Sequence, residues 1–271
     1  MAFLQTQFFS NTLNVEVTVN ILLPEGSQGI GVDGSVEQEP AKVLYLLHGY
    51  SDDHSIWMRR TSVERYAAAH NLAVIMPAVN HSYYLNEVQG ERYWDFVSEE
   101  LPAAVQRFFR VSDRWEDTFV AGLSMGGYGA MKLALTYPER FRAAASFSGV
   151  TDFVSMTHSD PERRDRWQRI AGDIDKLEGS DKDLFALLEK NRNVAHKPAL
   201  FVSCGTNDSL FDQHQRFIPA LQANGWQVAH AEVPERTHEW RFWDEQIRFF
   251  IPWMLGRKDL AEKVQPPCFT E

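Results

Sequence analysis

One stretch of sequence decides how this chain folds: TFVAGLSMGGYGA, residues 118–130. Its first four residues are typical of a short buried strand, and residues 127–135 carry small and apolar side chains at helical spacing. Between them lies a G-x-S-x-G motif centred on Ser124. The motif glycines are needed because a Cβ two residues either side of the serine would collide with neighbouring backbone. The stretch therefore predicts a strand, a sharp turn that projects the Ser124 hydroxyl, and a helix.

Short continuous apolar runs alternate with helical segments on both sides of this motif. Such runs are expected in a parallel sheet whose two faces are covered by helices. The expected strands are residues 43–47, 72–76, 118–121, 143–147, 199–202 and 228–233. The expected helices are residues 62–70, 99–109, 125–137, 212–224 and 239–255, with Pro138 and Gly225 as stops.

The N-terminal region has a different pattern. Residues 15–23 alternate apolar and polar side chains, and residues 3–9 are expected to pair with them as an antiparallel hairpin across Ser10 and Asn11. A glycine-rich surface loop follows at residues 24–41. The sequence thus predicts one α/β domain over residues 1–271, with a mostly parallel sheet of about eight strands. Residues 151–197 separate two strands unusually widely, and form either a cap with one or two short helices or a solvated loop.

Composition excludes several classes of protein. The 271 residues are 44% hydrophobic with a net charge of -10, which suits a compact domain and argues against nucleic-acid binding. No apolar run reaches the roughly 18 residues of a membrane span, and the first cationic residue, Lys42, comes too late for a secretory signal. Cys204 and Cys268 form no C-x-x-C motif and are predicted to be free thiols. Free thiols indicate a reducing compartment, so we expect a cytoplasmic protein. A homo-oligomer is left open.

A serine nucleophile needs a base to take its proton and an acid to orient that base. On this kind of sheet the acid and then the histidine follow the serine in loops at the carboxyl ends of strands. Asp208 follows the strand at 199–202 in a turn-forming G-T-N-D, and Asp152 is the rival acid. His238 lies in the loop after the last strand and is the expected base. The other histidines are expected to be ordinary surface or packed imidazoles.

The sequence His48-Gly49-Tyr50 ends the strand at 43–47. His48 and His54 could form a loose metal cluster, but we favour a turn that passes close to the substrate. In that interpretation the Tyr50 and Met125 backbone N–H groups form an oxyanion hole. We expect no metal and no organic cofactor.

Several runs together resemble the bacterial tributyrin esterase family, in the esterase D group of α/β-hydrolases, which also holds S-formylglutathione hydrolases. The resemblance covers about residues 8–255 and rests on residues 44–49, 57–64, 76–77, 99–102, 121–130, 144–149 and 238–240. It implies an α/β-hydrolase fold and a cytoplasmic carboxylesterase for short acyl chains. Ser124, Asp208 and His238 match the family's triad, and Tyr50 and Met125 its oxyanion amides.

Aromatic residues are expected to wall a closed apolar slot for a small ester substrate: Trp57, Tyr83, Tyr84, Tyr93, Trp94 and Trp240. Three other functions remain open. An S-formylglutathione hydrolase would typically carry a cysteine soon after the His-Gly turn, where this chain has Tyr50-Ser51-Asp52. An acyltransferase would prefer an added alcohol to water, and a non-catalytic relative would have lost a triad residue.

Overall fold

The computed structural model describes residues 1–26, 30, 34 and 37–257, so part of the predicted 24–41 loop lies outside the described residues. Eight strands form one sheet in the order β1-β2-β4-β3-β5-β6-β7-β8. The strands are β1 (Ala2–Ser10), β2 (Val15–Leu23), β3 (Lys42–Leu47), β4 (Leu72–Pro77), β5 (Thr118–Leu123), β6 (Ala143–Phe147), β7 (Ala199–Gly205) and β8 (Val228–Val233). From β4 to β8 all neighbours run parallel. The predicted fold is confirmed.

The N-terminal hairpin is antiparallel, as predicted. β1 and β2 pair from Ala2 opposite Leu23 to Ser10 opposite Val15, and β2 joins the rest of the sheet through an antiparallel pairing with β4. Along β1 the side chains alternate between half-buried and exposed, which reflects one covered and one open face. All six residues of β4, in the interior of the sheet, are buried.

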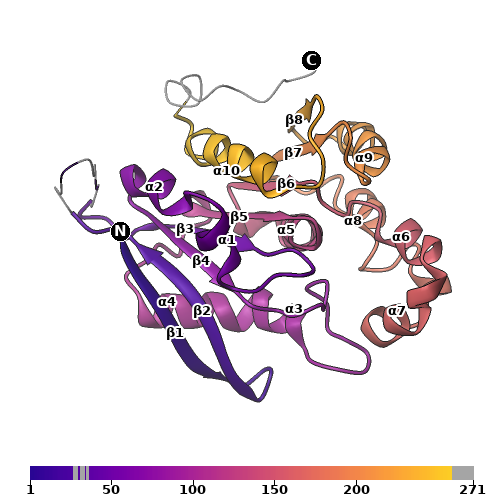
Figure 1. Ribbon diagram of the computed structural model, residues 1–271, viewed down its shortest axis with the longest axis horizontal. Coiled ribbons are helices and arrows are strands. Elements are labelled where there is room, and N and C mark those ends of the chain that lie inside the picture. Colours follow the sequence, from indigo (N-terminus) through magenta and orange to yellow (C-terminus); the bar gives the residue numbers. More distant parts are fainter. Residues whose placement is uncertain (27–29, 31–33, 35–36, 258–271) are drawn as a thin grey trace.

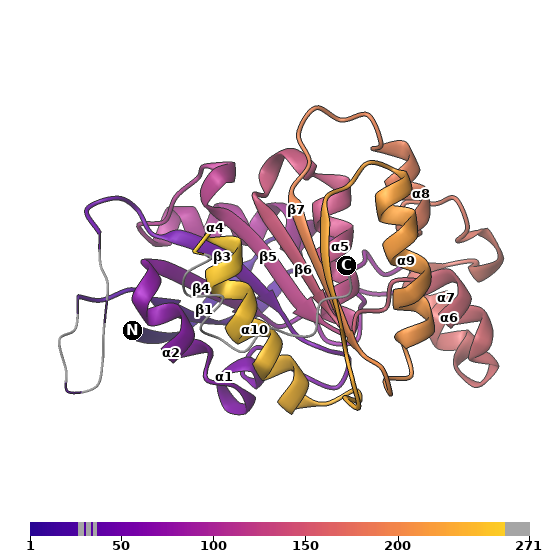
Figure 2. The ribbon, with the colours of Figure 1, turned by 90° about the horizontal axis from the view of Figure 1, so that it is seen from above.

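Two layers of helices sandwich the sheet (Figures 1 and 2). On one face pack α1 (Ile56–Arg60), α2 (Val63–Ala67) and α10 (Trp240–Met254). On the other face pack α3 (Tyr93–Asp95), α4 (Leu101–Phe108), α5 (Met125–Thr136), α8 (Leu184–Lys190) and α9 (Phe211–Ala223). The predicted helices are present with shifted ends: residues 68–70 form a 3-10 turn and residues 96–100 a π-helical turn. The sequence analysis missed α1 and α3.

Residues 151–197 contain three short α-helices, where the sequence predicted one or two or a solvated loop: α6 (Phe153–Ser159), α7 (Arg164–Ala171) and α8. Aspartates begin two of them, because the Asp152 side chain accepts from the Ser155 N–H and Asp183 from the Phe185 N–H. Trp167 and Ile170 of α7 are buried, so this charged segment has an apolar face turned toward the core.

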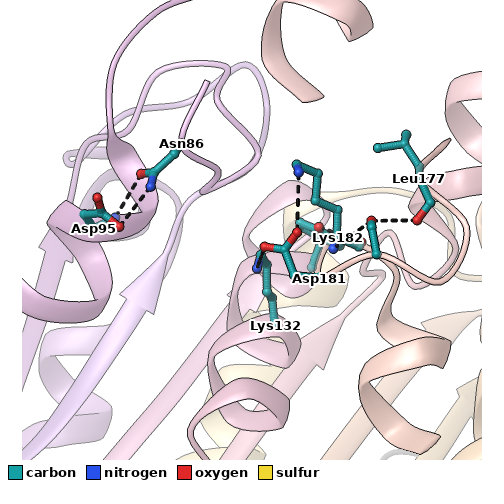
Figure 3. A network of polar contacts seen from close by, with 8 residues as sticks. Asn86, Asp95, Lys132, Leu177, Asp181 and Lys182 are labelled. Carbon is teal, nitrogen blue, oxygen red and sulfur yellow. Dashed lines mark hydrogen bonds and ion pairs between the residues drawn. The ribbon is translucent and has the colours of Figure 1, made fainter. Parts of the chain in front are cut away.

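A polar network fastens this segment to α5 (Figure 3). Lys132 of α5 is 1% exposed, and its ammonium lies 3.3 Å from Asp181 Oδ2 and 3.9 Å from the centre of the Trp94 ring. Burial lowers the pKa of Lys132, and the Asp181 carboxylate offsets part of that shift. One turn away on α5, the Tyr128 hydroxyl donates to the Lys182 carbonyl over 2.8 Å.

Figure 3 also shows Asn86 paired with Asp95, which fixes the loop before α3.

Within the described part of the chain, no helix is both long enough and apolar enough to cross a lipid bilayer.

We expect Asp181→Asn to lower the free energy of unfolding by about 1 to 2 kcal/mol, because it leaves a buried ammonium without its counter-ion. Lys132→Met removes the charge and keeps the side-chain length, so it should cost less or stabilise the protein. Urea unfolding at neutral pH measures both variants. Asp173→Asn, which breaks an exposed pair with Lys176, is the control and should change little. A larger loss for Lys132→Met than for Asp181→Asn would contradict this account.

Candidate active site

Ser124 lies at the sharp turn between β5 and α5. Its backbone has φ 52° and ψ -118°, an unusual conformation for a residue other than glycine. The Ser124 N–H donates to the Phe147 carbonyl at 3.0 Å, and the Ser124 carbonyl accepts from the Val150 N–H at 3.2 Å. The neighbouring strand β6 and the turn that follows it therefore hold the serine in its strained conformation.

The backbone is crowded at both motif glycines. A Cβ on Gly122 would lie 2.3 Å from the Gly126 carbonyl oxygen, and a Cβ on Gly126 would lie 2.4 Å from the Leu47 carbonyl oxygen. Neither neighbour is a flexible side chain that could move aside. The reason given for these glycines from the sequence is confirmed.

Asp208 and His238 meet above the carboxyl ends of β7 and β8. His238 Nδ1 lies 2.9 Å from Asp208 Oδ2 and 3.1 Å from Oδ1, and the Leu210 N–H donates to Oδ1 at 2.9 Å. Burial disfavours the charged form of Asp208, but these hydrogen bonds and the nearby imidazole outweigh it and lower the pKa of the carboxyl. A buried carboxylate thus fixes one ring nitrogen of a histidine whose side chain is one-third exposed.

The rival acid, Asp152, is engaged elsewhere. Its carboxylate caps α6 through Ser155 and lies 2.7 Å from the Arg216 guanidinium on α9. Its own N–H donates to the Gln213 side chain. These contacts give Asp152 a structural role in joining α6 to α9.

Ser124 and His238 line the same pocket. It has a volume of about 410 Å³ and is lined by Gly49, Tyr50, Ser51, Asp52, Leu123, Ser124, His238, Trp240 and Trp243. The pocket brings together a hydroxyl, an imidazole with a buried carboxylate behind it, and an aromatic wall. This combination can perform nucleophilic acyl transfer.

The turn after β3 passes close to the serine. A Cβ on Gly49 would lie 3.7 Å from Ser124 Cβ and only 2.6 Å from a methyl carbon of Leu123. The Gly49 N–H donates to Asp52 Oδ2 over 3.2 Å, which shapes the turn from the pocket side. The backbone of residues 49–50 therefore runs beside the serine.

His48 holds this turn from below. Its Nδ1–H donates to the Gly49 carbonyl at 2.7 Å, and its Nε2 accepts from the Val79 N–H at 3.0 Å. The Tyr84 hydroxyl donates to the His48 carbonyl. Burial lowers the pKa of His48 to about 4, so the ring is neutral at pH 7. With both nitrogens engaged, His48 has no lone pair to offer a metal, and His54 lies against Gln5 instead.

Of the aromatic residues predicted to bind substrate, only Trp240 lines the pocket in the described part of the chain. Trp240 lines the pocket, whereas Trp57 is buried behind it, with its ring edge-on to Trp240 and its N–H on the Leu47 carbonyl. Tyr84 is fully buried under the turn. Tyr83 packs against the Tyr50 ring and Trp167 of α7.

The remaining two aromatics lie elsewhere. Trp94 stacks on Tyr137 at 5.9 Å, and the Tyr93 hydroxyl accepts from the Asn80 side-chain amide. Neither lines the pocket.

Sequence reasoning missed two features of the pocket. Trp243 meets the His238 ring edge-on at 4.9 Å, and its spacing of three from Trp240 could have placed both on one helix side. Arg166 of α7 donates to the Tyr50 hydroxyl, so residues 151–197 reach the turn beside the serine. No local pattern in the sequence indicates that second contact.

A strand, a serine-bearing turn and a helix, with a carboxylate and a histidine delivered by later loops, define the α/β-hydrolase class of enzymes. The chain belongs to the esterase family, because the sequence model of that family, described as putative esterase, matches residues 10–249 of the chain.

Similar proteins agree with this membership. An acetyl esterase of Caldicellulosiruptor saccharolyticus is 30% identical over 267 residues, which cover 96% of this chain and all of the relative. The structure of FphF, a fluorophosphonate-binding serine hydrolase of Staphylococcus aureus, superposes with a TM-score of 0.82 at 34% identity, covering 94% of this chain and 98% of that one. An S-formylglutathione hydrolase of the same organism, FrmB, gives 0.78 at 33% identity with the same coverage. The chain is thus an enzyme of the carboxylesterase type.

We expect Gly126→Ala to lower the free energy of unfolding by about 1 to 3 kcal/mol, because its methyl group would press on the backbone of residues 47 and 48. Gly90→Ala is the control: the nearest neighbour of its added methyl is the flexible end of Glu87, and stability should change by less than about 0.5 kcal/mol. Chemical denaturation measures both. Equal stability of the two variants would contradict the crowding argument.

Proposed function

We propose that this protein is a serine carboxylesterase that hydrolyses short-chain acyl esters through Ser124, His238 and Asp208. The observation that carries the proposal is the pocket in which a strained serine and a carboxylate-bound histidine lie together. The esterase family and the serine hydrolase relatives support it.

In the proposed first half-reaction, Ser124 Oγ attacks the ester carbonyl carbon while His238 Nε2 takes the hydroxyl proton. Asp208 holds the Nδ1–H of His238, which fixes the tautomer that leaves Nε2 free to accept, and stabilises the imidazolium that forms. His238 then returns the proton to the departing alcohol as the C–O bond breaks. Water repeats the sequence on the acyl-enzyme and releases the acid.

The Tyr50 and Met125 N–H groups are the proposed donors to the carbonyl oxygen as it becomes negative. Met125 begins α5, where backbone N–H groups have no partner within the helix and the helix dipole is positive. Tyr50 is on the turn that His48 and Asp52 hold beside the serine. Losing one such donor typically slows an enzyme about 10² to 10³-fold.

Short acyl chains are the proposed substrates because the pocket is small and walled by rigid rings. Trp240 and Trp243 stand edge-on to each other at 5.1 Å, and Trp57 supports Trp240 from behind. We further propose that residues 151–197 act as a cap, since Arg166 and Tyr83 connect α7 to Tyr50 at the pocket. The free, buried Cys204 is compatible with the cytoplasmic location proposed from the sequence.

An S-formylglutathione hydrolase is the second candidate, supported by the 33% identity to FrmB. The chemistry is the same on a thioester. Tyr50, Ser51 and Asp52 occupy the positions after the His-Gly turn where a cysteine would be expected in that group, which favours the ester.

We expect Asp208→Asn to lower kcat for a small aryl acetate by on the order of 10⁴, because an amide cannot hold the His238 tautomer that accepts a proton. Asp152→Asn is the matched control and should keep kcat within about threefold, since its contacts are with Ser155 and Arg216. Ser124→Ala sets the baseline and should lose at least about 10³-fold. A crippled Asp152→Asn beside an active Asp208→Asn would transfer the acid role to Asp152. Full activity in Ser124→Ala would overturn the proposed function.

We expect kcat/KM for aryl esters to rise about fourfold per methylene from acetyl to butyryl and to fall for longer chains. Each buried methylene contributes about 0.8 kcal/mol until the tryptophan wall is reached. Trp240→Ala should move the optimum to longer chains, whereas Trp115→Ala, at an exposed site away from the pocket, should leave it unchanged.

The same series should include S-formylglutathione. An optimum at eight carbons or more in the wild type would contradict the small pocket. A preference for S-formylglutathione of tenfold or more would select the second candidate and leave the triad assignment in place.

A further inference from the structure

Two histidines and a glutamate converge on the face of the sheet that α9 covers. His214 projects from α9, and His230 and Glu232 are two residues apart on β8, so that both face the same side. One ligating atom of each residue lies within 4.8 Å of the other two, and His214 Nε2 is 3.9 Å from Glu232 Oε1. The sequence analysis treated both histidines as ordinary imidazoles.

His214 is the unusual member of this cluster. It is 2% exposed, and neither of its ring nitrogens has a hydrogen-bond partner among the described residues. A buried polar group without a partner is destabilising, so such groups usually have a ligand, an ion or a water. Burial, and to a lesser extent the neighbouring His230, lowers the pKa of His214 to about 4.

We propose that His214, His230 and Glu232 bind one divalent transition-metal ion of the zinc type. Two imidazoles and one carboxylate are a ligand set that zinc uses, with water in the fourth position. Tetrahedral bonds of about 2.0 to 2.1 Å require ligand atoms about 3.3 Å apart. A contraction of about 1.5 Å or less brings the three atoms to that spacing, and the half-buried Glu232 side chain can supply most of it.

The ion would join two elements that serve the pocket. α9 begins three residues after Asp208, and β8 ends five residues before His238. The Asp208 carboxylate partly offsets the lowering of the His214 pKa, so the cluster lies close enough to the triad carboxylate for the two to interact electrostatically. A cation here would cross-link α9 and the edge strand β8, and its binding does not depend on ester hydrolysis.

The test is calorimetric titration of tag-free, chelator-treated full-length protein with Zn²⁺ at pH 7. We expect one saturable site in the wild type, weakened at least tenfold in both His230→Gln and Glu232→Gln. His158→Gln, which removes an exposed histidine beside Asp175, is the matched control and should bind like the wild type. Co²⁺ should give a four-coordinate absorption spectrum in the wild type that both ligand variants lose.

Thermal unfolding provides a second readout, because a ligand bound only by the folded state raises Tm. Zn²⁺ should raise the Tm of the wild type and of His158→Gln more than that of either ligand variant. Melting curves without metal establish that the variants are folded. Absence of saturable Zn²⁺ binding in the wild type, or binding unchanged in both folded ligand variants, would overturn the proposal.

Discussion

The close approach of α5 to the turn after β3 is the constraint on which the rest of the site depends. Gly126 allows the first turn of the helix to touch the carbonyls of Leu47 and His48 without an intervening side chain. That contact brings the helix N-terminus and the Gly49 turn close to Ser124. Trp57 and Tyr84 then hold the turn from behind through the same two carbonyls. A larger residue at this point would push the start of α5 away from the turn after β3.

The catalytic candidates could be found from sequence because strand ends determine where they lie. Parallel strands deliver their following loops to one edge of the sheet, so an apolar run followed by Asp208 or His238 was enough to bring the two residues together. Side-chain direction is a different matter. Tryptophans commonly line pockets, and Trp94 and Trp57 were predicted to do so. Instead the Trp94 ring lies against Lys132 and the Trp57 N–H donates to the Leu47 carbonyl, because tertiary packing decides these contacts. Arg166 reaches Tyr50 across 116 residues of sequence, and local spacing contains no information on that contact.

Two buried polar side chains, His48 and Lys132, differ in how their hydrogen-bonding groups are satisfied. His48 has a backbone hydrogen-bond partner on each ring nitrogen, and these two bonds hold its ring in place under the turn. Lys132 reaches one carboxylate and one aromatic face, which fasten residues 151–197 to α5, the helix that follows Ser124. His48 fixes the turn at the end of β3, and Lys132 fixes a turn within residues 151–197. The geometry of the pocket is therefore supported by polar contacts as well as by the apolar core.

The backbone conformation of Ser124 has a consequence for how this enzyme matures. A φ of 52° at a residue with a side chain is unfavourable by itself and is held by contacts from Phe147 and Val150, both distant along the chain. The reactive geometry thus cannot exist in a partly folded chain that lacks the central sheet. Labelling of the serine during renaturation would therefore report completion of the native structure and not formation of the local turn. Ser124 thus takes up its native conformation only once the strands around it have assembled.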